Sequence, residues 1–203
     1  MRVYLETERL TLRQLTEDDA DNLFELDGDP AVMRFLSGGA PTPRAVIERE
    51  ILPRFLAWYG RGGGYGVWAA IEKASGAFLG WFSFHPHTGG DPGKIALGYR
   101  LRRAVWGRGY ATEGARALIR KGFTELGARR VIATTYQDNL ASRRVMEKAG
   151  LRLARTFRLT AADLVATGTF HANDVELWDG DDVEYALDKA YWERQEFASE
   201  PPQ

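Results

Sequence analysis

Alternating apolar and polar residues predict a series of short strands along the chain. Leu10 and Leu12 alternate with Thr11 and Arg13, which is the two-residue period of a half-buried strand over residues 6–15. The same pattern, bounded by turn residues, predicts further strands at 65–71, 77–84, 94–101, 129–136, 151–159 and 182–187. We therefore expect a seven-stranded sheet.

Helical spacing of apolar residues predicts the elements between these strands. One helix follows Thr16 and ends near Gly28, and others are predicted at 43–59, kinked at Pro53, and at 112–126 and 141–149. The strand at 94–101, the helix at 112–126 and the strand at 129–136 make a βαβ unit, whose right-handed crossover makes the two strands parallel. This order predicts a mixed sheet covered by helices.

Length and composition favour one domain over residues 1–198, followed by a disordered tail at 199–203. The 203 residues are 44% hydrophobic and 27% charged, which is ordinary globular usage. An acidic insertion at 161–180 is expected to carry its own hairpin at 164–170. No run of about 18 apolar residues exists and the start is charged, so we expect a cytoplasmic protein with no membrane contact.

The supply of reactive side chains excludes several chemistries. There are no cysteines, so disulfides, thiolate nucleophiles and cysteine metal sites are excluded. With only three histidines, a zinc site built on imidazole is disfavoured, and we expect no metal. A carboxylate-rich magnesium site is not excluded by the composition. The net charge of -1 is uneven: residues 100–158 hold fifteen Lys or Arg and four acids, a local balance of +11. This segment is expected to meet an anion, with solvated charged faces as the alternative.

A strand, a glycine-containing turn and a helix follow one another over residues 94–126. Gly107 and Gly109 precede the predicted helix start, where backbone amides lack internal partners and the peptide dipoles leave partial positive charge. Without a Cβ, both glycines let a phosphate approach the backbone, so the turn is a candidate anion cradle. A simple chain turn is the alternative. A dinucleotide fold fits badly because Thr112 occupies the place of its third glycine.

Three motifs resemble the GNAT superfamily and, within it, the RimJ/RimL-like acetyltransferases, over residues 8–192. They are residues 7–13 (TERLTLR), 106–113 (WGRGYATE) and 139–151 (NLASRRVMEKAGL). The resemblance implies a GNAT fold of α/β (α+β) class: a mixed, mostly antiparallel, twisted sheet of seven strands with helices on both faces. It also implies acetyl-coenzyme A as cosubstrate and an amine as acceptor.

The resemblance assigns roles to particular positions. Backbone groups of Leu101 and Arg103 are expected to bind the pantetheine amides, and Ser142 is the expected catalytic residue near the thiolate leaving group. Asn139 is expected at the pantetheine arm and Arg144 at the adenosine phosphates; a helix cap and a first-turn serine are the plainer interpretations of Asn139 and Ser142. The expected pyrophosphate loop consists of Trp106, Gly107, Arg108, Gly109, Tyr110, Ala111 and Thr112.

The chain departs from the family pattern in three places. Trp106 replaces the common Arg or Gln before the first glycine, Met146 replaces a tyrosine acid, and Ala96 replaces a glutamate on the strand. Methionine cannot donate a proton, so Ser142, a water molecule or Tyr136 is expected to serve, or the thiolate leaves unassisted. The general base stays unassigned among Asp27, Asp29, Asp91, His85 and the acids around Asp181.

The expected function is direct acetyl transfer to an amine in a ternary complex, the amine being a protein N-terminus or a small molecule. A lysine with a pKa of about 10.4 costs roughly 4 to 5 kcal/mol to neutralise at pH 7, whereas an α-amine costs roughly 1 kcal/mol. The missing base therefore favours weakly basic amines. The alternatives are a non-catalytic acyl-coenzyme A sensor and a nucleic-acid-binding module; the sequence is also compatible with a homodimer.

Overall fold

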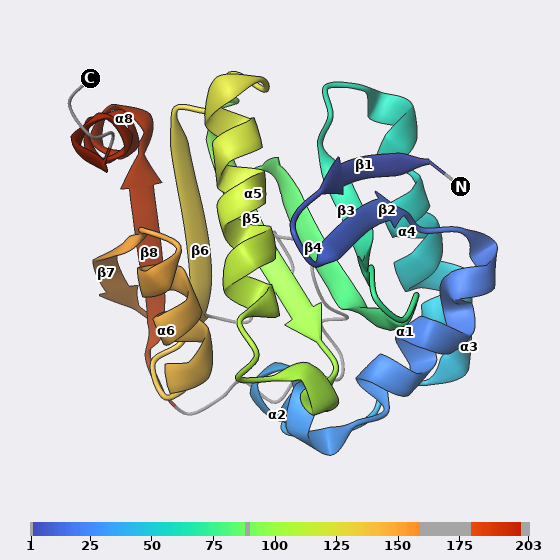
Figure 1. Ribbon diagram of the computed structural model, residues 1–203. Coiled ribbons are helices and arrows are strands. Elements are labelled where there is room, and N and C mark those ends of the chain that lie inside the picture. The colour runs from blue at the N-terminus through green and yellow to red at the C-terminus, as the bar shows by residue number, and fades with distance from the viewer. Residues whose placement is uncertain (1, 88–89, 159–179, 200–203) are drawn as a thin grey trace.

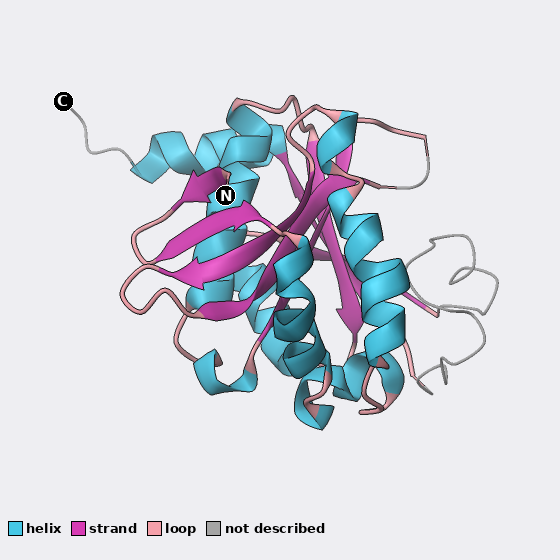
Figure 2. Cartoon of the chain, turned by 90° about the vertical axis from the view of Figure 1, so that its right-hand side faces the viewer, coloured by secondary structure: helices cyan, strands magenta, loops and turns pink. Residues whose placement is uncertain are grey.

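An eight-stranded sheet with helices on both faces forms the protein (Figures 1 and 2). The computed structural model describes residues 2–87, 90–158 and 180–199. The strand order is β1-β2-β3-β4-β5-β6-β8-β7. The strands are β1 Val3–Glu6, β2 Leu10–Gln14, β3 Gly66–Glu72, β4 Phe78–Pro86, β5 Lys94–Leu101, β6 Arg130–Tyr136, β7 Arg152–Phe157 and β8 Asp182–Asp188.

The sheet has eight strands where the sequence predicted seven. Residues 6–15 were expected to form one strand, but the strand there is only Leu10–Gln14, and a turn joins it to the unpredicted strand β1 in an antiparallel hairpin. Thr7 makes the turn: its amide donates to the Leu10 carbonyl at 2.9 Å, and its Oγ1 accepts from the Leu10 amide at 2.9 Å. A threonine hydroxyl that competes for backbone partners is a local turn signal, which the period-two pattern concealed.

The helices partly follow the sequence prediction. They are α1 Ala20–Asp27, α2 Pro30–Ser37, α3 Arg44–Val46, α4 Leu52–Leu56, α5 Tyr110–Thr124, α6 Leu140–Lys148 and α8 Lys189–Ser199. The helix predicted at 43–59 is interrupted by a π-helical turn, Ile47–Ile51, just before Pro53. Because proline has no amide hydrogen, the regular ladder cannot continue through it.

Two helices were not predicted. At the start of α2, Asp29 accepts a hydrogen bond from the Ala31 amide at 2.8 Å and Pro30 occupies the first turn. The sequence predicted only that the preceding helix ends near Gly28, although a proline directly after such an end is suited to starting a new helix. The second missed helix, α8, follows directly from β8. Much of the 161–180 insertion, including its predicted hairpin, lies outside the described residues, as does the tail from residue 200.

Strands β5 and β6 are parallel, as the βαβ pattern predicted, and they separate along their length. Within the described chain their register pairs are Lys94 with Arg130, Ile95 with Val131 and Ala96 with Ile132. Both strands then continue, β5 to Leu101 and β6 to Tyr136, while they stay paired with β4 and β8 on their other sides. We call the opening between residues 97–101 and 133–136 the β5–β6 wedge.

Helix α5 packs closely on one face of the sheet (Figure 1). The helical spacing of apolar residues that predicted this helix corresponds to its buried face, which consists of Ala115, Leu118, Ile119, Gly122 and Phe123. A Cβ at Gly114 would lie 2.3 Å from Cζ of Phe82 on β4, so only glycine allows this approach. The close packing fixes the start of α5 against the end of β5.

A second apolar cluster covers the other face of the sheet. Leu23 and Leu26 of α1 and Leu52 of α4 pack there on strand residues from β3 and β4. The sheet therefore has α5, α6 and α8 on one side and α1 to α4 on the other (Figure 1). Among the described residues, no helix combines the length and the apolar character needed to cross a membrane.

Candidate functional site

The wedge exposes one edge of β5. Arg102 donates its amide to the Leu79 carbonyl of β4 at 2.7 Å, so the adjacent residue Leu101 presents its backbone groups to the opposite side, toward the wedge. The Leu101 carbonyl accepts from Nε1 of Trp106 at 2.8 Å, and the Arg103 carbonyl accepts from the Trp106 amide at 3.1 Å. The carbonyls of Leu101 and Arg103, two of the backbone groups expected to bind pantetheine, thus each have a partner inside the protein.

The glycine turn lies between the end of β5 and the start of α5. Gly107 and Gly109 have φ values of +74° and +84°, which favour glycine. Gly109 is the N-cap of α5, and no side chain caps the first turn. A Cβ at Gly107 would meet nothing within 4 Å, so space lies beside the backbone there. The turn stays a candidate anion cradle, because it precedes the first turn of a 15-residue helix, where backbone amides lack helical partners.

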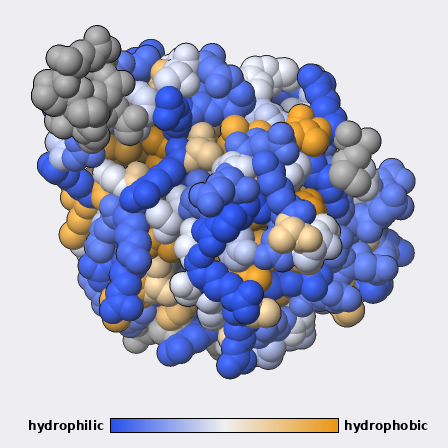
Figure 3. Space-filling model, in the orientation of Figure 1, coloured by the Kyte–Doolittle hydropathy of each residue, from blue (hydrophilic) through white to orange (hydrophobic). Residues whose placement is uncertain are grey.

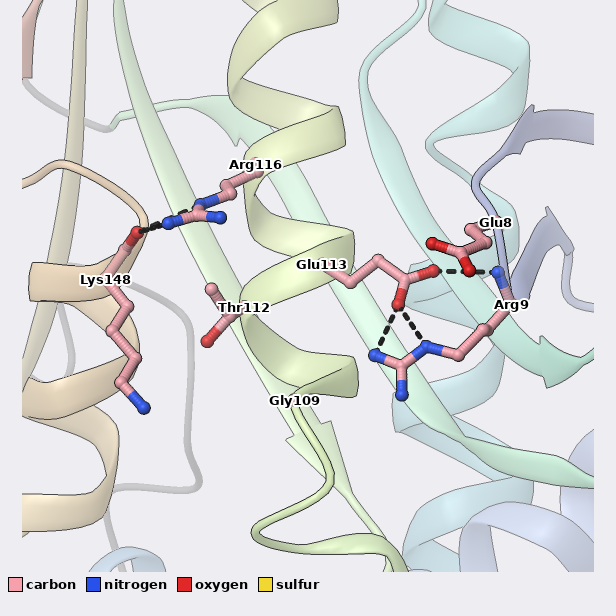
Figure 4. A pocket seen from close by; sticks show the side chains of 7 residues that line it. All are labelled: Glu8, Arg9, Gly109, Thr112, Glu113, Arg116 and Lys148. Atoms are coloured by element: carbon pink, nitrogen blue, oxygen red, sulfur yellow. Dashed lines mark hydrogen bonds and ion pairs between the residues drawn. The ribbon is translucent and has the colours of Figure 1, made fainter.

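Arg9 and Glu113 fasten this turn to the β1–β2 hairpin (Figure 4). Glu113 on α5 accepts from Thr7 Oγ1 at 2.5 Å and from the Arg9 amide at 2.9 Å, and it forms an ion pair with the Arg9 guanidinium at 2.6 Å. Arg9 Nη1 also donates to the Arg108 carbonyl at 2.9 Å. These contacts give the residues 7–13 motif a physical role: the hairpin holds the loop in place.

The surroundings of Glu113 keep it charged. Burial raises the pKa of its carboxyl, but the hydrogen bonds from Thr7 and Arg9 and the charge of Arg9 outweigh burial and lower the pKa below its ordinary value. The negative charge of Glu113 is therefore matched by Arg9 within the site. Tyr110 lies under the Arg9 guanidinium, 4.4 Å from it, and donates its hydroxyl to Glu72.

A cavity of about 470 Å³ opens at the start of α5 (Figure 4). Its lining residues are Glu8, Arg9, Gly109, Thr112, Glu113, Arg116 and Lys148. The structure thus brings predicted residues Gly109 and Thr112 together with Arg116 and Lys148, which sequence reasoning did not assign. Arg116 donates to the Lys148 carbonyl at 2.9 and 2.6 Å and so ties α5 to α6. The four-residue spacing from Thr112 to Arg116 could have indicated that the two side chains share one face of the helix.

Tyr99 and Ser142 connect β5 to α6. The Tyr99 hydroxyl lies 3.0 Å from Ser142 Oγ and 3.1 Å from the Ser142 carbonyl. Burial raises the pKa of Tyr99 to about 12, so the phenol stays protonated at neutral pH. Sequence reasoning missed Tyr99, because its distance from Ser142 in the chain hides the contact.

Asn139 and Arg144 take different positions on α6. Asn139 is the N-cap: its Oδ1 accepts from the Ser142 amide at 3.2 Å, and its Nδ2 donates to Thr135 Oγ1 at 3.1 Å. The plainer interpretation of Asn139 as a helix cap is thus confirmed, and the cap also fixes Ser142. Arg144 is exposed on the same helix.

The three departures from the family pattern also have definite places. Met146 is buried in the core under α6, with 2% of its surface exposed. Trp106 is 48% exposed and makes the bond to Leu101 already described. Ala96 belongs to the last register pair of β5 and β6, at the closed end of the wedge.

Three of the candidate proton acceptors have other partners. Asp27 forms an ion pair with Arg100 at 2.6 Å, and Asp29 caps α2. Asp91 accepts from the Gly93 amide at 2.8 Å and forms an ion pair with Arg129 at 2.5 Å. His85, on β4, is free of ion pairs among the described contacts, and its ring stacks on Trp58.

Many basic residues of the 100–158 segment are matched by carboxylates. The pairs are Arg100 with Asp27, Arg102 with Glu25, Arg129 with Asp91, Arg130 with Asp188, and Arg155 with Glu184. The visible face over α5 and α6 is mostly hydrophilic, with apolar groups scattered across it (Figure 3). Within the part of the chain that the structure describes, no group of three or more potential ligands forms a metal site.

Comparison with known proteins places the chain in a family. The family model described as an acetyltransferase (GNAT) domain matches residues 9–152. The FsC-acetyl coenzyme A-N(2)-transacetylase of Aspergillus fumigatus is 35% identical over 163 residues, which cover 75% of this chain and 66% of the fungal protein.

Solved structures agree in fold. A GNAT-family acetyltransferase from Bacillus anthracis superposes with a TM-score of 0.71 at 23% identity, covering 94% of this chain and 99% of its own. RimL, a ribosomal L7/L12 α-N-protein acetyltransferase solved with coenzyme A, superposes with a TM-score of 0.70 at 18% identity. The superposition covers 92% of this chain and 98% of the RimL chain. The match of the family model over residues 9–152 shows that the chain belongs to the GNAT family of N-acetyltransferases, which use acetyl-coenzyme A.

Proposed function

We propose that the protein transfers the acetyl group of acetyl-coenzyme A directly to a weakly basic primary amine, either a peptide α-amine or a small molecule, in the manner of RimJ/RimL-like enzymes. The observation that carries this proposal is the wedge, which leads from the glycine turn to the Tyr99–Ser142 pair. Because the chain contains no cysteine, a thiolate cannot take up the acetyl group as an intermediate.

The described residues fit a coenzyme along the wedge. Amides of the turn from Trp106 to Thr112 would hold the pyrophosphate, and each amide-to-phosphate bond would contribute roughly 1.5 to 3 kcal/mol because the acceptor is charged. Arg116, Lys148 and Arg144 would supply positive charge at the adenosine phosphates. Residues 97–101 of β5 have no pairing with β6, so this edge would receive the pantetheine arm over a length of roughly 16 Å, with the Leu101 carbonyl already bonded to Trp106.

Ser142 would assist the departure of the thiolate. Its hydroxyl would donate a hydrogen bond to the leaving sulfur, and the Tyr99 hydroxyl, 3.0 Å from Ser142 Oγ and 3.1 Å from the Ser142 carbonyl, would then act as the donor to Oγ. This arrangement supplies the donor that Met146 cannot supply. A hydrogen bond to a charged acceptor contributes about 1.5 to 3 kcal/mol, which corresponds to roughly 10-fold to 100-fold in rate.

The direct test of this function is the release of coenzyme A thiol with a panel of amines. We expect release with peptides bearing free α-amines or with small weakly basic amines, and less with lysine side chains, because fewer of these are neutral at pH 7. Acetyl-coenzyme A binding without release across the whole panel would instead identify an acyl-coenzyme A sensor. Salt-dependent nucleic-acid binding without coenzyme binding would contradict both.

Removing the two hydroxyls tests the role of the Tyr99–Ser142 pair. We expect Ser142→Ala to lower kcat by roughly 10-fold to 100-fold and Tyr99→Phe to lower it less, with acetyl-coenzyme A affinity nearly unchanged. The double variant should resemble Ser142→Ala, because Tyr99 acts through the serine. Strictly multiplicative losses in kcat would show that the hydroxyls act independently and would contradict the relay.

A further inference from the structure

His85 and Ala96 face each other across β4 and β5. They form a register pair, and paired residues of an antiparallel ladder point to the same face, with Cβ atoms about 4.5 to 5.5 Å apart. Ala96 is also the last residue of β5 that pairs with β6. The imidazole therefore lies next to Ala96 at the closed end of the wedge. Ala96 is the position where the family resemblance expects a carboxylate.

His85 lies on the face of the sheet opposite α5 and α6, beside Trp58 of the second apolar cluster. Phe82 and Phe84 of β4 pack against α5, so His85, one residue beyond Phe84, points to the opposite face. Helices α5 and α6 cover the first face and carry the glycine turn and Ser142. Because coenzyme A is expected along the glycine turn and Ser142 on the first face, the acceptor amine would approach the wedge from the face that carries His85.

The environment of His85 fixes its orientation and its proton. The ring stacks on Trp58, with centroids 4.9 Å apart and planes 17° apart. Nδ1 lies 3.2 Å from the Pro86 carbonyl. Because a carbonyl only accepts, this contact is a hydrogen bond in the tautomer with hydrogen on Nδ1, and that tautomer leaves the lone pair on Nε2.

The charge state suits a proton acceptor. Burial lowers the pKa of His85, and the neighbouring His87 and Arg61 lower it further, whereas the Pro86 carbonyl partly offsets them. The group is therefore neutral at pH 7. The charged groups Lys94, Glu184 and Arg155 lie instead around His87.

We propose that His85 is the general base that accepts the proton of the attacking amine, replacing the carboxylate missing at Ala96; this inference rests on the proposed function. The amine nitrogen forms the C–N bond to the thioester carbonyl carbon, and the C–S bond breaks with its electron pair going to sulfur. Nε2 of His85 takes the proton from nitrogen, and the thiolate takes a proton through Ser142 or solvent. The products are an amide and a free thiol, and solvent returns the base to its neutral form.

Substitution of His85 gives the kinetic test. We expect His85→Gln to lower kcat by about 100-fold to 10,000-fold, the usual contribution of a general base, with acetyl-coenzyme A affinity unchanged. His85→Phe keeps an aromatic ring against Trp58 and should lower kcat by a similar factor. The matched control is His87→Gln, two residues along the chain on the same face, which should keep wild-type kcat. His85→Gln combined with Ala96→Glu should recover much of the lost rate, because it restores a carboxylate one strand away.

Nitrogen-15 NMR of the imidazoles gives a readout that does not depend on turnover, with His85→Gln assigning the signal. We expect His85 to be neutral at pH 7, with hydrogen on Nδ1 and none on Nε2. Hydrogen on Nε2, or a His85→Gln variant as active as wild type, would overturn the assignment. If the proposed function itself fails, the wild-type chain releases no thiol with any amine; if only this inference fails, wild type and His85→Gln are equally active.

Discussion

Gly109→Leu should lower the affinity for coenzyme A by about 100-fold or more, because at least two amide-to-phosphate bonds of roughly 1.5 to 3 kcal/mol each would be lost. Gly109 has a φ of +84°, and a Cβ there would lie 3.4 Å from Arg9 Nη2. The larger side chain would therefore project beside the first-turn amides of α5 and displace Arg9, which holds the turn. Isothermal titration calorimetry with coenzyme A measures the effect.

The matched control for this change is Gly76→Leu. Gly76 also has a positive φ, +72°, and nothing lies within 4 Å of its Cβ position, but it belongs to the turn between β3 and β4. The backbone strain of a non-glycine residue, roughly 1 to 2 kcal/mol, is then present in both variants, and only Gly109→Leu should lose coenzyme affinity. Equal coenzyme A affinities of the two variants would show that the glycine turn is not part of the coenzyme site.

Asp19→Ala should reduce the free energy of unfolding by about 3 to 5 kcal/mol, the usual cost of removing one partner of a buried ion pair. Asp19 and Arg13 are 2% and 7% exposed, and their two hydrogen bonds are both 2.7 Å. The pair joins β2 to the start of α1, so it helps to hold α1 on its face of the sheet. Denaturant unfolding measures the loss, and the exposed neighbour Asp18→Ala should change stability by less than about 0.5 kcal/mol.

The same pair makes stability depend on acid pH. Burial raises the pKa of Asp19, but hydrogen bonds from Arg13 and the Thr16 amide outweigh burial, so the pKa is lowered overall. A lowered pKa means that the contribution is complete above the unfolded-state pKa of about 3.9 and is lost as the pH falls below it. The stability difference between wild type and Asp19→Ala should therefore shrink below about pH 4. A difference that stays constant down to pH 2 would contradict the role of the charge.

Local patterns predicted much of the fold because they depend on residues close together in sequence. The buried face of α5 and the parallel pairing of β5 with β6 followed from helical spacing and from the handedness of a βαβ crossover. The glycine turn was predicted for the same reason: Gly107 and Gly109 lie next to a helix start. The hairpin at Thr7 was missed, since one hydroxyl interrupted an otherwise regular strand pattern.

Contacts between distant segments could not be predicted from the sequence. Sequence reasoning retained His85 only as one of several proton acceptors, because pairing of His85 with Ala96 is a property of strand register. The Tyr99–Ser142 contact likewise requires α6 to pack beside β5, and the Arg9–Glu113 pair requires the first hairpin to lie over α5.

The sequence alone determined most of the elements, the absence of a cysteine nucleophile and the position of the glycine turn, since propensity, spacing and residue type act locally. The tertiary structure decided where β5 and β6 separate, which carboxylates are already paired and which side chains meet at the wedge. Those features depend on register and packing between segments many residues apart, and a one-dimensional pattern does not specify them.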